Sequence, residues 1–222
     1  LIMFTSGSSG HPKAVTHTFN SLYASAVMHY SIVHPGGNDI FLSSLPLYHI
    51  GGFMVFVRAL LCGCGTAFPE SLQFDDINEA IESFNPSVIS IVPTTLERIT
   101  AAGQKPNTKL KFAFTGGGPA PSELIIKARS LGWPIVKVYG STETASMVTA
   151  LNPDQIMKRP DSAGKPLAGV ELKTADGLLA VKSPSLFSGY LNNSAETGLK
   201  LINGWYYTGD FARIENDGYL YI

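Results

Sequence analysis

The sequence predicts an α/β protein in which a mostly parallel sheet flanked by helices is followed by a small, distorted barrel-like β-rich subdomain. Along residues 1–159, short apolar segments alternate with segments of helix length, as in a parallel sheet covered on both faces. After about residue 160 the pattern changes to short strands and turns. We therefore place an α/β subdomain at 1–159 and a β-rich subdomain at 160–222.

The predicted elements follow from apolar periodicity and from turn residues. Strands are predicted at residues 1–4, where the strand should be buried, and at 39–45, 66–68, 88–92, 111–115 and 135–139. Helices are predicted at 20–33, 53–61 and 77–84. A further helix should begin at Pro93, and another, capped by Ser122, should run to residue 130. The β-rich part should hold strands at 177–182, 189–190, 205–208, 211–214 and 219–222.

Composition excludes several classes of protein. Apolar residues make up 45% of the 222 positions, and the net charge of −1 favours neither nucleic acid nor an anionic membrane as partner. The most apolar run, residues 53–68, is interrupted by Arg58, so membrane insertion is not expected. Cys62 and Cys64 are too few for a disulfide framework or a closed zinc site, which favours reduced cysteines and a cytoplasmic protein.

Four polar or glycine-rich loops, at residues 5–13, 46–52, 116–121 and 140–144, each follow a predicted strand. Ligands of parallel sheets bind where strands end and such loops gather, so we expect one shared crevice. Loop 5–13 suits a polyphosphate, because its glycines allow close backbone approach, its hydroxyls donate to phosphate oxygens and Lys13 supplies positive charge. It is not the P-loop of NTPases, since Lys13 follows Pro12 rather than a glycine. On these residues alone, a plain surface loop is the alternative.

The order of four motifs carries more information than any one of them. They are Thr-Ser-Gly-Ser-Ser-Gly-His-Pro-Lys at 5–13, Pro-Leu-Tyr-His at 46–49, Tyr-Gly-Ser-Thr-Glu at 139–143 and Tyr-Thr-Gly-Asp at 207–210. In this order the chain resembles the adenylate-forming superfamily of acyl- and aryl-CoA synthetases, luciferases and adenylation domains. The resemblance implies an ATP-dependent acid-thiol ligase that works through an acyl-adenylate. It also implies ATP, Mg²⁺, coenzyme A as co-substrate and a small carboxylic acid as partners.

The resemblance also implies roles for individual residues. The nucleotide would contact Thr5, Ser6, Gly7, Ser8, Ser9, Gly10, Gly117, Gly118, Pro119, Tyr139, Gly140, Ser141 and Asp210. Of these, the Ser/Gly loop would hold the β- and γ-phosphates, Tyr139 would lie along the adenine, and Asp210 would accept from the ribose hydroxyls. The implied catalytic residues are Lys13, His49, Thr142 and Glu143. Among them Thr142 would bind the α-phosphate and Glu143 the magnesium ion.

The chemistry of the side chains agrees with these roles. A carboxylate is a hard ligand for Mg²⁺, a hydroxyl donates to phosphate, and an imidazole stabilises developing negative charge. Structural alternatives exist for each motif. Ser141 and Thr142 would cap a following helix with Glu143 in its first turn, Asp210 would be a turn residue, and His49 a structural histidine. We expect His17, His29 and His34 to be solvent-exposed or capping, and His11 to be a variable loop residue.

Several runs, at 45–53, 57–60, 91–96, 114–121 and 139–146, are most similar to one branch of the superfamily, the o-succinylbenzoate-CoA ligases of menaquinone biosynthesis. Other acyl- or aryl-CoA synthetases compete within the family, and a non-catalytic nucleotide- or acyl-binding module is the rival class. A substrate with two carboxylates needs a second anion-binding group. Arg58 is the nearest arginine, although a paired or snorkelling structural arginine is the alternative that the sequence favours.

The family's N-terminal subdomain, its hinge Gly-Arg and its C-terminal lid with the adenylation lysine do not occur in these 222 residues. We therefore interpret the chain as the central part of a longer protein. The isolated chain should bind ATP or an acyl-adenylate weakly and adenylate poorly. The sequence leaves open whether two copies form a homodimer.

Overall fold

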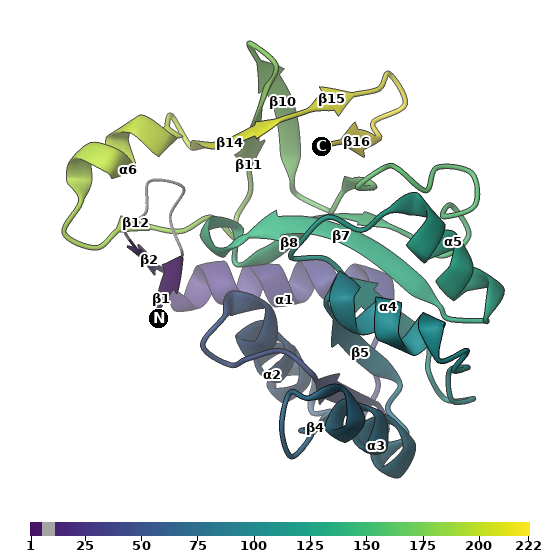
Figure 1. The fold of residues 1–222 in the computed structure, drawn as a ribbon. Helices are drawn as coiled ribbons and strands as arrows, with labels where there is room; N and C mark the ends of the chain where they lie inside the picture. Colours follow the sequence, from purple (N-terminus) through teal and green to yellow (C-terminus); the bar gives the residue numbers. More distant parts are fainter. Residues whose placement is uncertain (6–11) are drawn as a thin grey trace.

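The computed structural model describes residues 1–5 and 12–222 and is built around a seven-stranded sheet (Figure 1). The strand order is β4-β3-β5-β6-β7-β8-β9. The bounds are β3 (Ile40–Ser43), β4 (Gly65–Ala67), β5 (Val88–Ile91), β6 (Phe112–Thr115), β7 (Ile135–Ser141), β8 (Ser146–Leu151) and β9 (Lys165–Pro166). Neighbours from β4 to β7 are parallel, and β8 and β9 continue the sheet antiparallel. The predicted mostly parallel sheet is confirmed.

Helices cover both faces of this sheet, as expected for parallel strands joined by helical crossovers. One face carries α1 (Phe19–Val33) and α2 (Ile50–Cys62), and the other carries α3 (Phe74–Phe84), α4 (Pro93–Ala101) and α5 (Ser122–Ser130). The helix starts follow local chemistry. Thr18 accepts from the N–H of Ser21 to cap α1, and Pro93 occupies the first turn of α4.

The β-rich part stands above the main sheet (Figure 1). It contains a four-stranded sheet, a hairpin and one short helix. These are β10 (Glu171–Ala175), β11 (Leu178–Lys182), β13 (Leu201–Ile202), β14 (Trp205–Phe211), β15 (Arg213–Ile214), β16 (Leu220–Tyr221) and α6 (Ser194–Lys200). A domain boundary at 159/160 stays a prediction. Two strands after that point pair with elements before it, because β9 joins β8 and β12 (Gly189–Tyr190) joins β2 (Lys13–Thr16).

The prediction of a buried first strand in the main α/β layer was wrong. β1 (Ile2–Thr5) pairs antiparallel with β2, and together with β12 they form a separate three-stranded sheet. Because β1 is the edge strand, only its Met3 is buried, while Phe4 is 64% exposed. The loop at residues 5–13 therefore joins two antiparallel strands rather than a strand and a helix.

The helix that the structural alternative for Ser141 and Thr142 would place after β7 is absent from the described chain. A single 3₁₀ turn, η1 (Thr142–Thr144), is followed at once by antiparallel β8. Two residues with positive φ, Ala145 (51°) and Ser146 (88°), reverse the chain. The Thr144 hydroxyl closes the turn, since it accepts from the Ser141 N–H at 2.8 Å and donates to the Ser146 carbonyl at 2.6 Å.

Smaller differences concern element ends and short elements. Helix α2 begins at Ile50 rather than residue 53, and α5 begins at Ser122 itself after a Pro121 N-cap. Strands β9, β10 and β13 and helix α6 were not predicted, because two to seven residues carry too little periodicity. None of the helices in the described part of the chain has the length and apolarity of a membrane span.

Candidate active site

A cavity of about 690 Å³ lies at the carboxyl ends of β5, β6 and β7, a volume typical of small-molecule sites. Residues from all four predicted loops line it, including Thr5 and Lys13, Pro46 and His49, Gly116 and Gly117, and Gly140 to Glu143. The β-rich part completes its wall with Tyr190, Lys200, Tyr206, Thr208 and Asp210. The expectation that the four loops converge on one crevice is confirmed.

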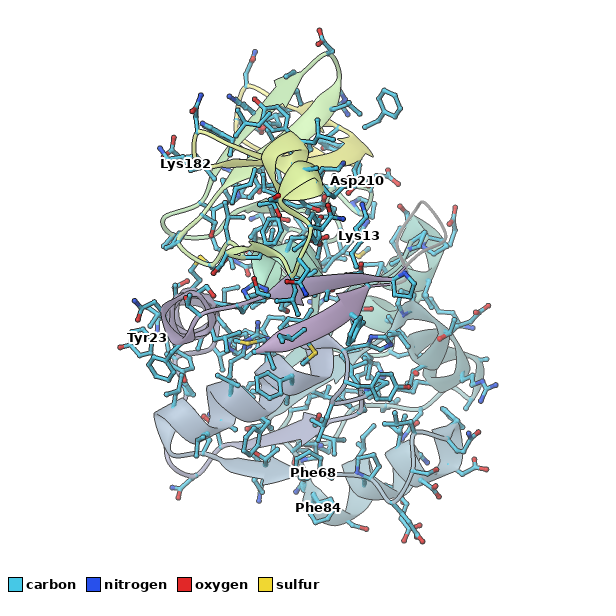
Figure 2. The ribbon with its side chains drawn as sticks, turned by 90° about the vertical axis from the view of Figure 1, so that its left-hand side faces the viewer. Lys13, Tyr23, Phe68, Phe84, Lys182 and Asp210 are labelled. Atoms are coloured by element: carbon cyan, nitrogen blue, oxygen red, sulfur yellow. The ribbon has the colours of Figure 1, made fainter. Side chains whose placement is uncertain are left out.

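The structure gathers most of the predicted site residues. Those that line the cavity are Thr5, Lys13, His49, Gly117, Gly140, Ser141, Thr142, Glu143 and Asp210. Gly118, Pro119 and Tyr139 are not among its lining residues. Ser6, Gly7, Ser8, Ser9 and Gly10 lie outside the described residues. In Figure 2, Lys13 and Asp210 lie one above the other, where β1 and β2 meet the C-terminal elements.

Lys13, the first residue of β2, is held at the rim of the cavity. Its Nζ lies 2.5 Å from Oε1 of Glu196 in α6 and 5.3 Å from the ring centroid of Tyr190. The hydrogen bond from Lys13 lowers the pKa of the Glu196 carboxyl. A cation fixed by an internal carboxylate is available to a phosphate that replaces the carboxylate as its partner.

Residues 142–145, which we name the clamped turn, are fixed by hydrogen bonds to their backbone. Each carbonyl oxygen of the clamped turn accepts from another segment: Thr142 from His17 Nε2 (2.7 Å), Glu143 from the Phe187 N–H (2.8 Å), Thr144 from Ser185 Oγ (2.9 Å) and Ala145 from Ser25 Oγ (2.6 Å). Because a carbonyl only accepts, Nε2 of His17 must carry the proton. The clamped turn thus has its geometry before any ligand arrives.

Glu143 combines burial with access to the cavity. It is 7% exposed, lines the cavity, and its Oε1 accepts from the Tyr190 hydroxyl at 2.9 Å. No cluster of three or more His, Cys, Asp or Glu side chains suited to a metal occurs in residues 1–5 and 12–222. A site with one protein carboxylate fits Mg²⁺, which is usually bound through one or two carboxylates together with substrate phosphates and water.

Asp210, which lines the cavity, interacts directly with Tyr139. The Tyr139 hydroxyl donates to Oδ2 of Asp210 at 2.5 Å. Burial, and then the hydrogen bond with Asp210, raise the pKa of Tyr139, so the phenol keeps its proton. The tyrosine thereby orients a solvent-exposed carboxylate.

One cation that lines the cavity has no hydrogen-bond partner for two of its nitrogens within the described residues. Arg58 of α2 lines the cavity at 3% exposure, and its Nε and Nη2 make no hydrogen bond within the described residues. Burial lowers the pKa of its guanidinium to about 10, so it stays charged at neutral pH. Ser90 of β5 lines the same region. Within the described residues Arg58 is thus neither paired with a carboxylate nor snorkelling to solvent, contrary to the alternative that the sequence favoured.

The histidines divide differently from the prediction. His49 is exposed at the N-cap of α2, lines the cavity, and lies 4.7 Å from the Tyr48 ring, centroid to centroid. His17 and His29 are not exposed or capping residues, since they are 5% and 1% exposed. His29 packs 4.7 Å from the Phe114 ring. Burial lowers the pKa of both imidazoles.

Sequence reasoning missed several lining residues of the β-rich part, among them Tyr190, Lys200 and Tyr206. Gly189-Tyr190 was identified only as a short strand, and an isolated Lys200 gives no signal in a sequence. These residues lie tens of residues or more away in sequence from the α/β loops that they contact, so no local pattern links them to the cavity.

Comparison with known proteins agrees with this arrangement. Residues 1–191 match the family model described as AMP-binding enzyme. The chain belongs to the AMP-binding enzyme family. A 2-succinylbenzoate-CoA ligase of Bacillus pumilus is 32% identical over 231 residues, covering 100% of this chain and 48% of the relative. The chain thus spans about half the length of the curated relatives it matches.

Solved structures of the family superpose closely on the fold. The o-succinylbenzoate CoA synthetase of Bacillus subtilis in complex with its acyl-adenylate intermediate OSB-AMP matches with a TM-score of 0.94 at 32% identity, covering 99% of this chain and 48% of that one. The same enzyme in complex with ATP and a magnesium ion matches with a TM-score of 0.93 at 32% identity and the same coverage.

Proposed function

We propose that the complete protein carrying this chain is a carboxylate-CoA ligase that acts through an acyl-adenylate, with o-succinylbenzoate as its acid. In the first step a carboxylate oxygen attacks the α-phosphorus of ATP, and the bond to the β-phosphate breaks to release pyrophosphate. In the second, the thiolate sulfur of coenzyme A attacks the acyl carbon and AMP leaves. No enzyme nucleophile is required, so Cys62 and Cys64 have no role in the chemistry.

The observation that carries this proposal is the distribution of charge in one cavity. Lys13, Thr142 of the clamped turn and Asp210 all line it. This arrangement suits a nucleotide whose triphosphate meets Lys13 and Thr142 and whose ribose hydroxyls donate to Asp210. His49 would stand beside the reacting carboxylate, where an imidazole stabilises negative charge.

Magnesium fits the residues present. Glu143 would hold it, with phosphate oxygens and water completing its ligands. When bound there, magnesium would supply positive charge against the leaving pyrophosphate. Lys13 contributes to the same end from β2, and the hydrogen bonds of the clamped turn keep Glu143 in place.

Arg58 supports an acid that carries two carboxylates. A buried, unpartnered guanidinium is costly unless a ligand supplies the anion. When one carboxylate reacts near His49, a second carboxylate deeper in the cavity would pair with Arg58, and Ser90 could donate to it. An acyl-CoA synthetase for simple fatty acids would have no use for this charge.

The test is pyrophosphate release by the complete protein from ATP and Mg²⁺ over a panel of carboxylic acids that includes o-succinylbenzoate. Release should require that acid and collapse in Lys13→Ala, Glu143→Ala and Asp210→Ala. Release with another aryl or medium-chain acid would correct the substrate and keep the ligase. If no acid gives release while ATP still binds and Asp210→Ala weakens that binding, the protein is a nucleotide-binding module.

The cytoplasmic location is part of the same proposal and rests on the chemistry of the substrates. A homodimer is left to measurement of the mass of the complete protein in solution. We further expect the 222-residue chain alone to bind ATP more weakly than the complete protein.

A further inference from the structure

Tyr190 contacts both charged side chains at the polyphosphate end of the cavity. Its hydroxyl donates to Oε1 of Glu143 at 2.9 Å, and Nζ of Lys13 lies 5.3 Å from its ring centroid. Tyr190 is 6% exposed and lines the cavity. One side chain of β12 therefore touches the candidate metal ligand and the candidate phosphate ligand, which have opposite charge.

The hydroxyl of Tyr190 selects which carboxylate oxygen of Glu143 is free. Oε1 is occupied by the tyrosine, whereas no group in the described residues donates to Oε2. The phenol is the donor in this hydrogen bond, because a carboxylate oxygen accepts. A carboxylate with one oxygen fixed and the other open is oriented for a cation that approaches from the cavity.

Tyr190 is itself rigidly held. Its N–H donates to Oγ1 of Thr197 at 2.9 Å, its backbone pairs with Val15 of β2, and its ring packs against Phe187 with centroids 5.0 Å apart. An outer residue whose own position is fixed can transmit that position to a ligand side chain.

We propose that Tyr190 is a positioning residue for the magnesium nucleotide, which it serves by fixing the Glu143 carboxylate through its hydroxyl while its ring supports Lys13. This inference rests on the proposed function, because it takes Glu143 as the magnesium ligand. It adds a residue from the β-rich part that none of the sequence motifs contains.

The decisive variant is Tyr190→Phe, which removes the hydroxyl and keeps the ring beneath Lys13. We would titrate the complete protein by calorimetry with α,β-methylene-ATP, first in Mg²⁺ and separately in EDTA. The methylene bridge between the α- and β-phosphorus atoms of this analogue cannot be cleaved by the adenylation reaction. Loss of a partner that orients a metal ligand typically lowers metal affinity about 10- to 100-fold. Affinity in Mg²⁺ should fall by that order, and affinity in EDTA should stay at the wild-type value.

Two further variants make the outcome specific. Tyr219→Phe removes another buried hydroxyl, which donates to Gln155 at 3.3 Å, and should leave both affinities unchanged. In a Glu143→Gln background, which abolishes the gain from Mg²⁺, adding Tyr190→Phe should cause no further loss, because the two groups act as one unit.

The titrations distinguish a failure of the proposal for Tyr190 from a failure of the proposed function. If Glu143→Gln removes the gain from Mg²⁺ but Tyr190→Phe keeps it, the proposal for Tyr190 is wrong and the proposed function stands. An equal loss in Mg²⁺ and in EDTA shows a merely structural role for Tyr190 and also overturns the proposal. If the wild-type protein gains nothing from Mg²⁺, or binds no nucleotide, the assignment of Glu143 fails and the role of Tyr190 fails with it.

Discussion

Arg58 illustrates how much a single buried side chain can decide. The guanidinium has no protein partner within the described residues and yet keeps its charge, so the unliganded cavity carries an unpaired cation at its floor. Such a group lowers the stability of the protein until an anion binds beside it. It then strengthens the binding of a ligand that carries an anion at this point and of no other ligand. We expect Arg58 to govern which acids are accepted and to have little influence on ATP.

Replacing Arg58 with methionine, which keeps much of its volume, should raise KM for o-succinylbenzoate. A hydrogen bond to a charged group contributes about 1.5–3 kcal/mol, which corresponds to a change of roughly 10- to 150-fold. KM for ATP should not change, and a monocarboxylic analogue such as a 4-oxo-4-phenylbutyrate should be used as well as before. Steady-state kinetics on both acids checks this.

The matched control is Arg213→Met, an exposed arginine of β15 outside the cavity, which should have no effect on either acid. If Arg58→Met impairs both acids equally, Arg58 supports the cavity wall rather than binding a second carboxylate. A residue of this kind could be suspected from the sequence only as the arginine nearest the motifs. Its lack of a partner depends on how α2 packs on the sheet.

At the scale of elements, the clamped turn explains why β7 is followed by an antiparallel strand and not by a helix. A helix N-terminus after β7 would have offered free N–H groups to phosphate. Here the backbone turns back into β8, and carbonyl oxygens of the turn are tied to α1, to His17 and to residues 185–187. Rigidity thus comes from distant elements, and Thr142 and Glu143 owe their orientation to them.

Removing one tie should loosen the turn. Ser25→Ala deletes the hydroxyl that donates to the Ala145 carbonyl at 2.6 Å, in a position that is fully buried. An unsatisfied buried acceptor costs about 1–3 kcal/mol, and the free energy of unfolding should fall by that order. ATP affinity in Mg²⁺ should fall too, as measured by calorimetry.

Ser31→Ala in the same helix serves as the comparison, because its hydroxyl donates to the Met28 carbonyl within α1 at 2.6 Å. It should change stability slightly and leave ATP affinity unaltered. Equal effects of the two variants on ATP would show that Ser25 acts through α1 and not through the clamped turn.

The sequence predicted most elements of the α/β part because their signals are local. Pro93 begins α4 as expected, and Gly63 ends α2 in a left-handed conformation with φ of 68°. A helix start was one alternative for the turn at Thr142 to Thr144, since capping residues are the same in both cases. The partner of β12 could not be predicted, because strand pairing over more than 170 residues leaves no local pattern.

The same limit applies to the candidate site. The motifs brought Lys13, Thr142, Glu143 and Asp210 into view, and the structure places them around one cavity. Tyr190 lies outside every motif, and its role depends on contacts with two separate loops. Sequence motifs therefore located the candidate ligand-binding groups, and only the fold located the groups that orient them.

At the scale of the whole molecule, buried imidazoles link stability to pH. His29, at 1% exposure, lies between the Phe41 and Phe114 rings, with centroids 5.8 Å and 4.7 Å away. Burial, with a further contribution from the charge of Arg58, holds the pKa of His29 well below that of an unfolded histidine, about 6.5. The unfolded chain therefore binds a proton that the folded protein resists, and stability must fall as pH drops below about 6.5.

The free energy of unfolding, measured by denaturant titration from pH 7.5 to 5.5, should decrease, and His29→Leu should flatten the slope. One histidine contributes at most about 1.4 kcal/mol per pH unit. His34→Asn, at an exposed position with φ of 46° that asparagine tolerates, should leave the slope as it is. An unchanged slope in His29→Leu would assign the pH dependence to other groups, with His17 next in line.

The small sheet β1-β2-β12 has a consequence for the order in which the protein is made. Strands β3 to β8 are all encoded before residue 152, whereas Tyr190 and Glu196, the partners of Glu143 and Lys13, come later. These contacts close long loops, which lowers the rate at which they form relative to local contacts. A nucleotide bound as proposed would therefore meet its complete set of contacts only after residues 190–196 have been made.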